Sequence, residues 1–297
     1  MRIAVTGREG QLVRSLVEMS ADEAWKIIPL GRPEFDLAEP ERGADRLRAL
    51  APDVIVNAAA YTAVDQAELE PDLAFRINAE APGGLARIAS RMDVPLIQIS
   101  TDYVFDGGKN EPYTEGDVVN PLGVYGRSKL EGEERVRSEQ PDHAIIRTAW
   151  VYSPFGRNFL KTMAGLAGTR DEVAVVSDQR GNPTSALELA NALGRLLRCW
   201  SAGDRTGLGE SYHVAGSGEA TWSAFAEEIF RVCESMGAPP MRVRPIATED
   251  WPTRATRPRN SQLDCAKFAA DFGWRMPPWQ KSAEQVTRRV FSAASRA

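Results

Sequence analysis

A tyrosine and a lysine four positions apart are the residues of this chain best suited to proton transfer. Tyr125-Gly-Arg-Ser-Lys129 lies in a segment predicted to be helical, where this spacing puts both side chains on one face. Ser100-Thr101-Asp102 ends a predicted strand, and doubly wound folds bind ligands at such strand ends. A threonine hydroxyl facing the phenol and the ammonium would complete a proton-transfer set, in which the cation lowers the pKa of Tyr125. By itself, the Tyr/Lys pair is also compatible with a solvated helix face.

A glycine-containing turn supplies a candidate cofactor site. Gly7-Arg-Glu-Gly10 directly follows the first predicted strand and opens a helix. Glycines at such a turn let backbone N–H groups approach a pyrophosphate at the helix N-terminus. Val13 stands where the common glycine pattern of dinucleotide-binding turns has its third glycine. The strand–turn–helix context favours a dinucleotide site over an ordinary tight turn.

Two further segments have compositions that suit ligands. Asn57-Ala-Ala-Ala-Tyr-Thr-Ala-Val-Asp65 ends the third predicted strand, and its small residues would allow a cofactor to approach the backbone. A close-packed junction between strand and helix explains the same residues equally well. Arg254-Ala-Thr-Arg257-Pro-Arg259 places three arginines in a loop, and guanidinium groups suit phosphate recognition. We predict that Arg257 or Arg259 lies near a substrate diphosphate, with a solvated loop as the alternative.

The residues after the second predicted strand bear on the choice of nicotinamide cofactor. NAD-selective folds place an acid there, which accepts hydrogen bonds from the adenosine ribose. Here Gly31 and Arg32 follow the strand, and the first acids are Glu34 and Asp36. A guanidinium at Arg32 would pair with the 2′-phosphate unless it simply points into water. We therefore predict NADPH as the preferred cofactor, with NADH also accepted.

The elements that position these residues alternate between strand and helix. Predicted strands are 2–6, 26–30, 53–57, 94–100 and 144–147, with helices between them, including 125–137. This alternation predicts an α/β fold with a doubly wound parallel sheet (Rossmann-like). Beyond Trp150 the pattern loosens, which indicates a second, smaller mixed α/β substrate domain. We predict a dinucleotide-binding domain at 1–150, with a returning segment near 172–216, and a substrate domain at 151–171 and 217–297.

Composition excludes several classes of function. The 297 residues carry 36 basic and 41 acidic side chains, a net charge of −5, which disfavours a nucleic-acid surface. No apolar run approaches the roughly 20 residues of a membrane helix, and no secretory leader is visible. Three scattered cysteines and two histidines match no metal-site spacing and are typical of a reducing compartment. We therefore expect a cytoplasmic protein that binds neither membrane nor nucleic acid and has no metal site.

Longer motifs throughout the chain resemble one known family. They include Ile3-Ala-Val-Thr-Gly7, Val56-Asn-Ala-Ala-Ala-Tyr-Thr-Ala-Val-Asp65, Ile99-Ser-Thr-Asp-Tyr-Val-Phe-Asp-Gly107, Arg147-Thr-Ala-Trp-Val-Tyr152 and Arg257-Pro-Arg-Asn-Ser261. Together with the Tyr/Lys helix, they resemble the extended short-chain dehydrogenases/reductases, and within them the dTDP-4-dehydrorhamnose reductases. The resemblance implies NAD(P)H-dependent reduction of the C4 ketone of dTDP-4-dehydro-L-rhamnose, a nucleotide-diphospho-sugar. The resemblance is also compatible with a homodimer and with a requirement for Mg²⁺. The sequence contains no ligand motif for this ion.

The resemblance also assigns roles to individual residues. The implied catalytic residues are Thr101, Tyr125 and Lys129, where the tyrosine protonates the developing alkoxide and the lysine holds the nicotinamide ribose. The implied cofactor-binding residues are Gly7, Gly10, Gln11, Leu12, Ala58, Ala59 and Tyr61, with Asn78 nearby. The implied sugar-site residues are Thr62, Val64, Tyr103 and Trp150.

Two alternatives stay open at this point. A nucleotide-sugar epimerase or dehydratase shares the Tyr/Lys core. A dehydratase usually has an acid/base pair such as Asp-Glu beside its threonine, whereas here Asp102-Tyr103 follows Thr101. The second alternative is a regulatory subunit with a reductase-like fold, such as the β subunit of methionine adenosyltransferase, because fold and motif do not guarantee turnover.

Overall fold

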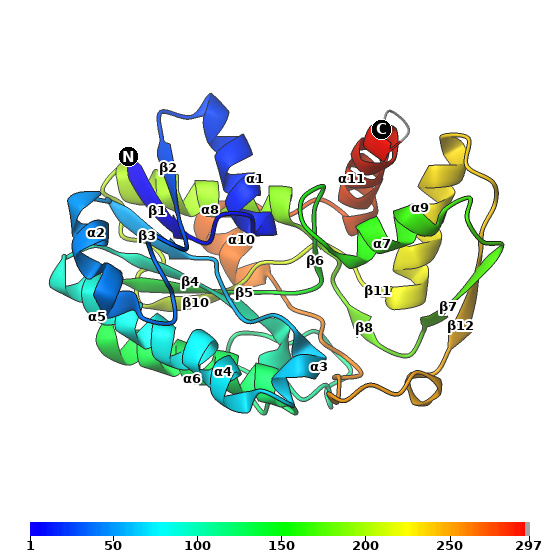
Figure 1. The fold of residues 1–297 in the computed structure, drawn as a ribbon, viewed down its shortest axis with the longest axis horizontal. Coiled ribbons are helices and arrows are strands. Elements are labelled where there is room, and N and C mark those ends of the chain that lie inside the picture. The colour runs from blue at the N-terminus through cyan, green and yellow to red at the C-terminus, as the bar shows by residue number, and fades with distance from the viewer. Residues whose placement is uncertain (295–297) are drawn as a thin grey trace.

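A six-stranded parallel sheet forms the centre of the computed structural model, which describes residues 1–294 (Figure 1). The strands are β1 (Arg2–Thr6), β2 (Lys26–Leu30), β3 (Val54–Asn57), β4 (Leu96–Thr101), β5 (His143–Thr148) and β10 (Glu210–His213). They lie in the order β10-β5-β4-β3-β1-β2, and every neighbouring pair is parallel. The predicted doubly wound, Rossmann-like sheet is confirmed. Its strand order reverses between β1 and β3, which is where such folds bind their ligands.

Helices cover both faces of this sheet because its central strands are buried on both sides. On one face lie α1 (Gln11–Met19), α8 (Ala186–Ser201) and α10 (Ala266–Phe272). On the other face lie α2 (Ala44–Ala49), α5 (Ala81–Arg91) and α6 (Val124–Glu139). Figure 1 shows the two helical layers on opposite sides of the sheet. Each layer forms its own apolar core with the strands, so that the strand ends are held in fixed register.

A second, smaller apolar core lies beyond β5. It contains residues of α7 (Phe159–Leu166), α9 (Trp222–Ser235), α11 (Trp279–Ala294) and β7 (Glu172–Val176). Strand β7 pairs in parallel with β12 (Arg242–Ile246), β6 (Val151–Tyr152) with β9 (Thr184–Ser185), and β8 (Arg180–Gly181) is antiparallel to β11 (Ala220–Thr221). This mixed α/β lobe occupies the other end of the molecule (Figure 1).

Two segments lie elsewhere than the predicted domain division implies. Strand β7 falls in the predicted returning segment, yet it pairs with β12 and packs in the smaller core. Helix α10 falls in the predicted substrate domain, yet Phe268 packs in the main core against Tyr212 of β10. Both differences arise from contacts between residues far apart in sequence. The division into domains stays a prediction.

Shorter helices fill the connections. They are α3 (Val64–Ala67), α4 (Pro71–Phe75), a π-helical turn (Arg76–Glu80) that joins α4 to α5, and four 3₁₀ turns: Ser20–Asp22, Pro40–Gly43, Asp102–Val104 and Thr248–Asp250. The π turn ends two residues before Pro82, which lies in the first turn of α5. Among residues 1–294, none of the helices has the length and apolar character needed to span a membrane.

Candidate active site

A cleft of about 710 Å³ opens at the carboxyl ends of β1, β3 and β4, and residues of the smaller lobe line its other side. Thirteen of the predicted site residues line it: Gly7, Gly10, Gln11, Leu12, Ala58, Ala59, Thr62, Val64, Thr101, Tyr103, Tyr125, Lys129 and Trp150. The cleft therefore lies at the switch point of the sheet, where a dinucleotide is expected. The roles of these residues stay predictions, but the structure brings them together.

The glycine turn at one end of the cleft suits a pyrophosphate. Gly7 has a φ of +97°, and a Cβ there would lie 3.3 Å from Cγ2 of Val13. Gly10 precedes the first residue of α1, and no side chain caps this helix. The amides of its first turn are therefore available to an anion. Val13 is almost fully buried and packs against the turn, so helix and strand remain close without the third glycine.

Hydrogen bonds between three neighbouring strands hold this end of the cleft. Thr6 at the end of β1 donates from Oγ1 to Asn57 Oδ1 at 2.6 Å, and Asn57 Nδ2 donates to Gln98 Oε1 at 2.7 Å. The amide of Ala59 donates to Thr6 Oγ1 at 3.1 Å. Without these hydrogen bonds, the three polar side chains would be costly to bury. The network therefore fixes the Asn57–Ala59 backbone, against which the cofactor is predicted to lie.

The predicted catalytic hydroxyls meet at the start of α6. Tyr125 shares a hydrogen bond with Thr101, and its ring meets that of Tyr103 edge-on with centroids 5.7 Å apart. Burial raises the pKa of Tyr125 to about 12, and the charge of Asp102 acts in the same direction. The sequence predicts the opposite, a pKa lowered by Lys129. That expectation is wrong, because burial outweighs every other influence on the phenol.

Lys129 lies one helical turn further along α6 and is only 3% exposed. Its ammonium donates to the backbone carbonyl of Ile99 at 2.6 Å. Burial lowers the pKa of Lys129 to about 8, while the carboxylate of Glu133 opposes this fall. The lysine is thus largely charged at neutral pH and fixed against the strand that carries Thr101.

A fully buried carboxylate supports this arrangement from behind. Glu133 accepts hydrogen bonds from Ser100 Oγ at 2.6 Å and from Arg147 Nε and Nη2 at 2.9 and 2.7 Å. Arg137 adds a further bond at 2.9 Å. These cations and hydrogen bonds hold the pKa of Glu133 below its usual value despite burial. Sequence reasoning missed this network because Ser100 and Arg147 come from two different strands and meet Glu133 only through packing.

Aromatic residues line the other end of the cleft. Trp150 stacks on Trp222 with centroids 3.7 Å apart and ring planes at 7°. A Cβ at position 181 would lie 2.5 Å from the Trp150 indole, so Gly181 is needed for this packing. Trp222 opens α9 and lines the cleft, although sequence reasoning assigned it no role. No local pattern identifies it, since only the packing of the smaller lobe brings it to the site.

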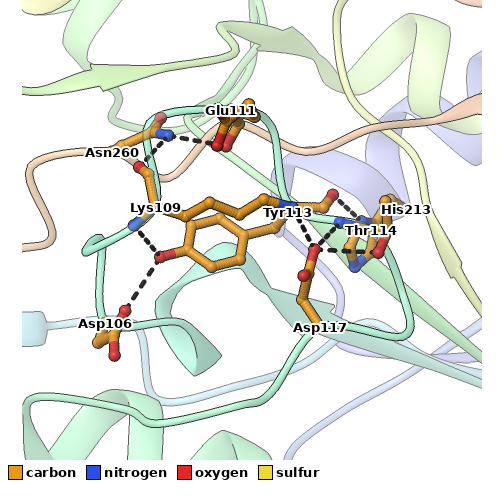
Figure 2. Close-up of polar contacts among 8 residues, drawn as sticks. All are labelled: Asp106, Lys109, Glu111, Tyr113, Thr114, Asp117, His213 and Asn260. Carbon is orange, nitrogen blue, oxygen red and sulfur yellow. Dashed lines mark hydrogen bonds and ion pairs between the residues drawn. The ribbon is translucent and has the colours of Figure 1, made fainter.

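The loop that follows Tyr103 is tied down by polar contacts, which Figure 2 shows. Tyr113 donates from its hydroxyl to Asp106 at 3.0 Å, and Lys109 pairs with Asp117 at 2.8 Å. Asn260, from the arginine-containing segment, donates to the carbonyl of Lys109 at 2.8 Å. These contacts hold the loop against the segment that contains Asn260 and give Asn260 a structural role.

Four predicted residues lie outside the cleft lining. Tyr61 and Asn78 bond to each other: the Tyr61 amide donates to Asn78 Oδ1 at 2.8 Å, and Asn78 Nδ2 donates back to the Tyr61 carbonyl at 3.0 Å. Arg257 pairs with Asp65 at 2.6 Å. Arg32 is exposed on the surface. Their predicted ligand contacts stay predictions.

A second arginine lies beside Arg32. Arg8 packs against Gly31, where a Cβ would come within 3.0 Å of the Arg8 side chain, and it pairs with Glu34. Glu34, the first acid after strand β2, therefore forms an ion pair with Arg8. Arg8 is thus a second candidate for contact with the 2′-phosphate of the cofactor. Its position inside the glycine turn could have identified it from the sequence.

Comparisons with known proteins agree on one family. The family model described as RmlD substrate binding domain matches residues 1–291. A dTDP-4-dehydrorhamnose reductase from Sinorhizobium fredii is 46% identical over 286 residues, which cover 96% of both chains. The crystal structure of such a reductase from Clostridium acetobutylicum has a TM-score of 0.90 at 37% identity and covers 98% of this chain and 99% of its own. One from Bacillus anthracis, in complex with NADP, has a TM-score of 0.90 at 34% identity and covers 97% and 99%.

Proposed function

The chain belongs to the RmlD substrate-binding-domain family, and from its kinship with dTDP-4-dehydrorhamnose reductases we propose that it reduces the C4 ketone of dTDP-4-dehydro-L-rhamnose to dTDP-L-rhamnose. The observation that carries the proposal is the convergence of Thr101, Tyr125 and Lys129 in one cleft with an uncapped, glycine-led helix N-terminus. A proton donor and a dinucleotide site side by side are what a ketone reductase requires.

The cofactor we propose is NADPH, with NADH accepted less well. The cradle at Gly7, the free amides of α1 and the small Ala58–Ala59 segment fit a dinucleotide. When bound, the reduced nicotinamide supplies the hydride. Lys129 would hold the nicotinamide ribose, and Arg8 or Arg32 would face the 2′-phosphate.

Residues of the chain hold and donate the proton that the reduction requires. Because burial raises the pKa of Tyr125 to about 12, its phenol is protonated at neutral pH and able to donate. Thr101 shares a hydrogen bond with that phenol and so orients it toward the cleft. Tyr125 then gives its proton to the alkoxide that forms at C4, and Lys129, one helical turn further along α6, would favour the resulting phenolate by its charge. The raised pKa keeps the resting phenol protonated but weakens it as an acid, so the transfer needs a positive charge that stabilises the phenolate.

Substrate binding is assigned to the aromatic end of the cleft. Thr62, Val64, Tyr103 and Trp150 would contact the sugar, and the Trp150–Trp222 stack would exclude water from it. Arg257 lies beside this end, paired with Asp65, and would have to leave that carboxylate to reach a diphosphate. The proposal extends to a cytoplasmic location, since NADPH chemistry and three free cysteines suit a reducing compartment.

The test is to incubate the purified protein with NADPH and the keto sugar and to identify the product. We expect oxidation of one NADPH for each dTDP-L-rhamnose formed. Isomerised sugar without net oxidation of NADPH would identify an epimerase, and loss of water a dehydratase. Binding of NADPH without turnover would instead support a regulatory subunit.

A further inference from the structure

A loop of the smaller lobe faces the glycine turn from across the cleft. Gly156 and Arg157 line the cleft, as do Gly10 and Gln11 at the N-terminus of α1. The loop therefore borders the same end of the cleft as the amides proposed to hold the cofactor pyrophosphate. No sequence motif pointed to it.

Arg157 is the unusual residue of this loop. It is exposed, and among residues 1–294 its guanidinium has neither a hydrogen bond nor an ion pair. Lys129 is the other basic residue of the described cleft lining, and its ammonium is buried and bonded to the carbonyl of Ile99. Glu9, an acid of the lining, lies 3.8 Å from Arg14. Arg157 is thus the cation of this lining that is free to meet an anion.

The backbone on either side of Arg157 is held in place by the cofactor helix itself. Gln11 Oε1 accepts hydrogen bonds from Ser153 Oγ and from Asn158 Nδ2, both at 2.9 Å. Asn158 also caps α7, because its Oδ1 accepts from the Lys161 amide at 3.0 Å. A side chain that rises from a fixed backbone loses less entropy when it binds a ligand.

The chemistry of the facing surfaces identifies the ligand. A dinucleotide pyrophosphate carries two negative charges, whereas the N-terminus of one helix offers only about half a positive charge. A guanidinium presents paired N–H donors that match phosphate oxygens. We propose that Arg157 binds the cofactor diphosphate from the smaller lobe, opposite the α1 amides. The inference rests on the proposed function, since it requires a dinucleotide at α1.

The test compares Arg157→Ala with Arg195→Ala. Arg195 is an exposed arginine of α8 without a polar partner among the described residues, and it lies outside the cleft lining. Dissociation constants for NADPH and NADH are measured by quenching of tryptophan fluorescence at several salt concentrations. In Arg157→Ala we expect both constants to rise roughly tenfold, with a weaker salt dependence, and Arg157→Lys to recover part of the affinity. Arg195→Ala should bind like the parent.

The use of two cofactors and of dTDP separates the possible phosphate partners. A loss confined to NADPH would assign Arg157 to the 2′-phosphate, and weaker binding of dTDP alone would assign it to the substrate diphosphate. Either result overturns the inference, as do unchanged constants in a variant whose thermal unfolding matches the parent. A parent protein that binds neither cofactor would instead refute the proposed function.

Discussion

Replacement of Tyr125 by Phe is the sharpest test of the proposed mechanism, because it removes the proton and little else. The ring and its edge-on contact with Tyr103 remain, while the bond shared with Thr101 is lost. Thr101 keeps its bond to Asp102 Oδ1 at 3.0 Å, so the cost in unfolding free energy should be about 1 kcal/mol. Loss of a positioned general acid typically lowers turnover by ~10²–10⁴-fold. This equals roughly 3–5 kcal/mol of activation free energy.

The assay follows the loss of NADPH absorbance with the keto sugar at saturating cofactor. The dissociation constant for NADPH should stay near that of the parent, since the lost hydroxyl serves the proton and not the diphosphate. Tyr212→Phe is the matched control: its hydroxyl donates to Asp271 at 2.6 Å, at the far edge of the sheet, and its loss should leave turnover unchanged. A Tyr125→Phe protein that turned over as fast as the parent would refute the assignment of the general acid.

Four more outcomes are expected. Because burial lowers the pKa of Lys129 to about 8, the affinity for NADPH should fall as the pH rises through that value, measured as a pH profile of the dissociation constant. The pKa of buried His213 falls from 6.5 to about 4, so the unfolded chain takes up the proton first as the pH drops. The unfolding free energy should therefore fall by up to about 3 kcal/mol from pH 6.5 to 4, and this part of the slope should vanish in His213→Asn under urea denaturation. Arg257→Ala should raise KM for the nucleotide sugar far more than it lowers kcat. An unchanged KM would show that Arg257 only pairs with Asp65 and does not bind the substrate. The ratio of kcat/KM for NADPH to kcat/KM for NADH should fall in Arg32→Ala. A fall seen only in Arg8→Ala would show that Arg8 of the glycine turn, and not Arg32, selects the cofactor.

The parts of the site that local sequence determines could be predicted. Tyr125 and Lys129 share a helix face because they are four residues apart, and Thr101 ends a strand whose apolar run is short and bounded. The parallel strands and the glycine turn follow from equally short patterns. Each of these features depends on neighbours within a few residues, which is the range over which propensity and periodicity act.

The parts that depend on packing could not be predicted in this way. Trp222 and Arg157 reach the cleft only because the smaller lobe folds against the main sheet. The Arg257 partner, Asp65, lies 192 residues earlier in the chain. The direction of the Tyr125 pKa was wrong for the same reason, since the extent of burial is a property of the whole fold.

The buried pair behind the cleft explains how an ammonium can be kept at its centre. Burying Lys129 favours its neutral form, and a single backbone carbonyl offsets this only in part. Glu133 supplies the opposing negative charge one helical turn away, but an uncompensated carboxylate there would itself be too costly to bury. Arg147 on β5 and Ser100 on β4 meet that cost with direct hydrogen bonds. The strand that ends in Thr101 and the helix that carries Tyr125 are thereby joined through one carboxylate. The same contacts that keep the lysine charged also fix the distance between the proposed catalytic hydroxyls, so charge and geometry have a single structural cause.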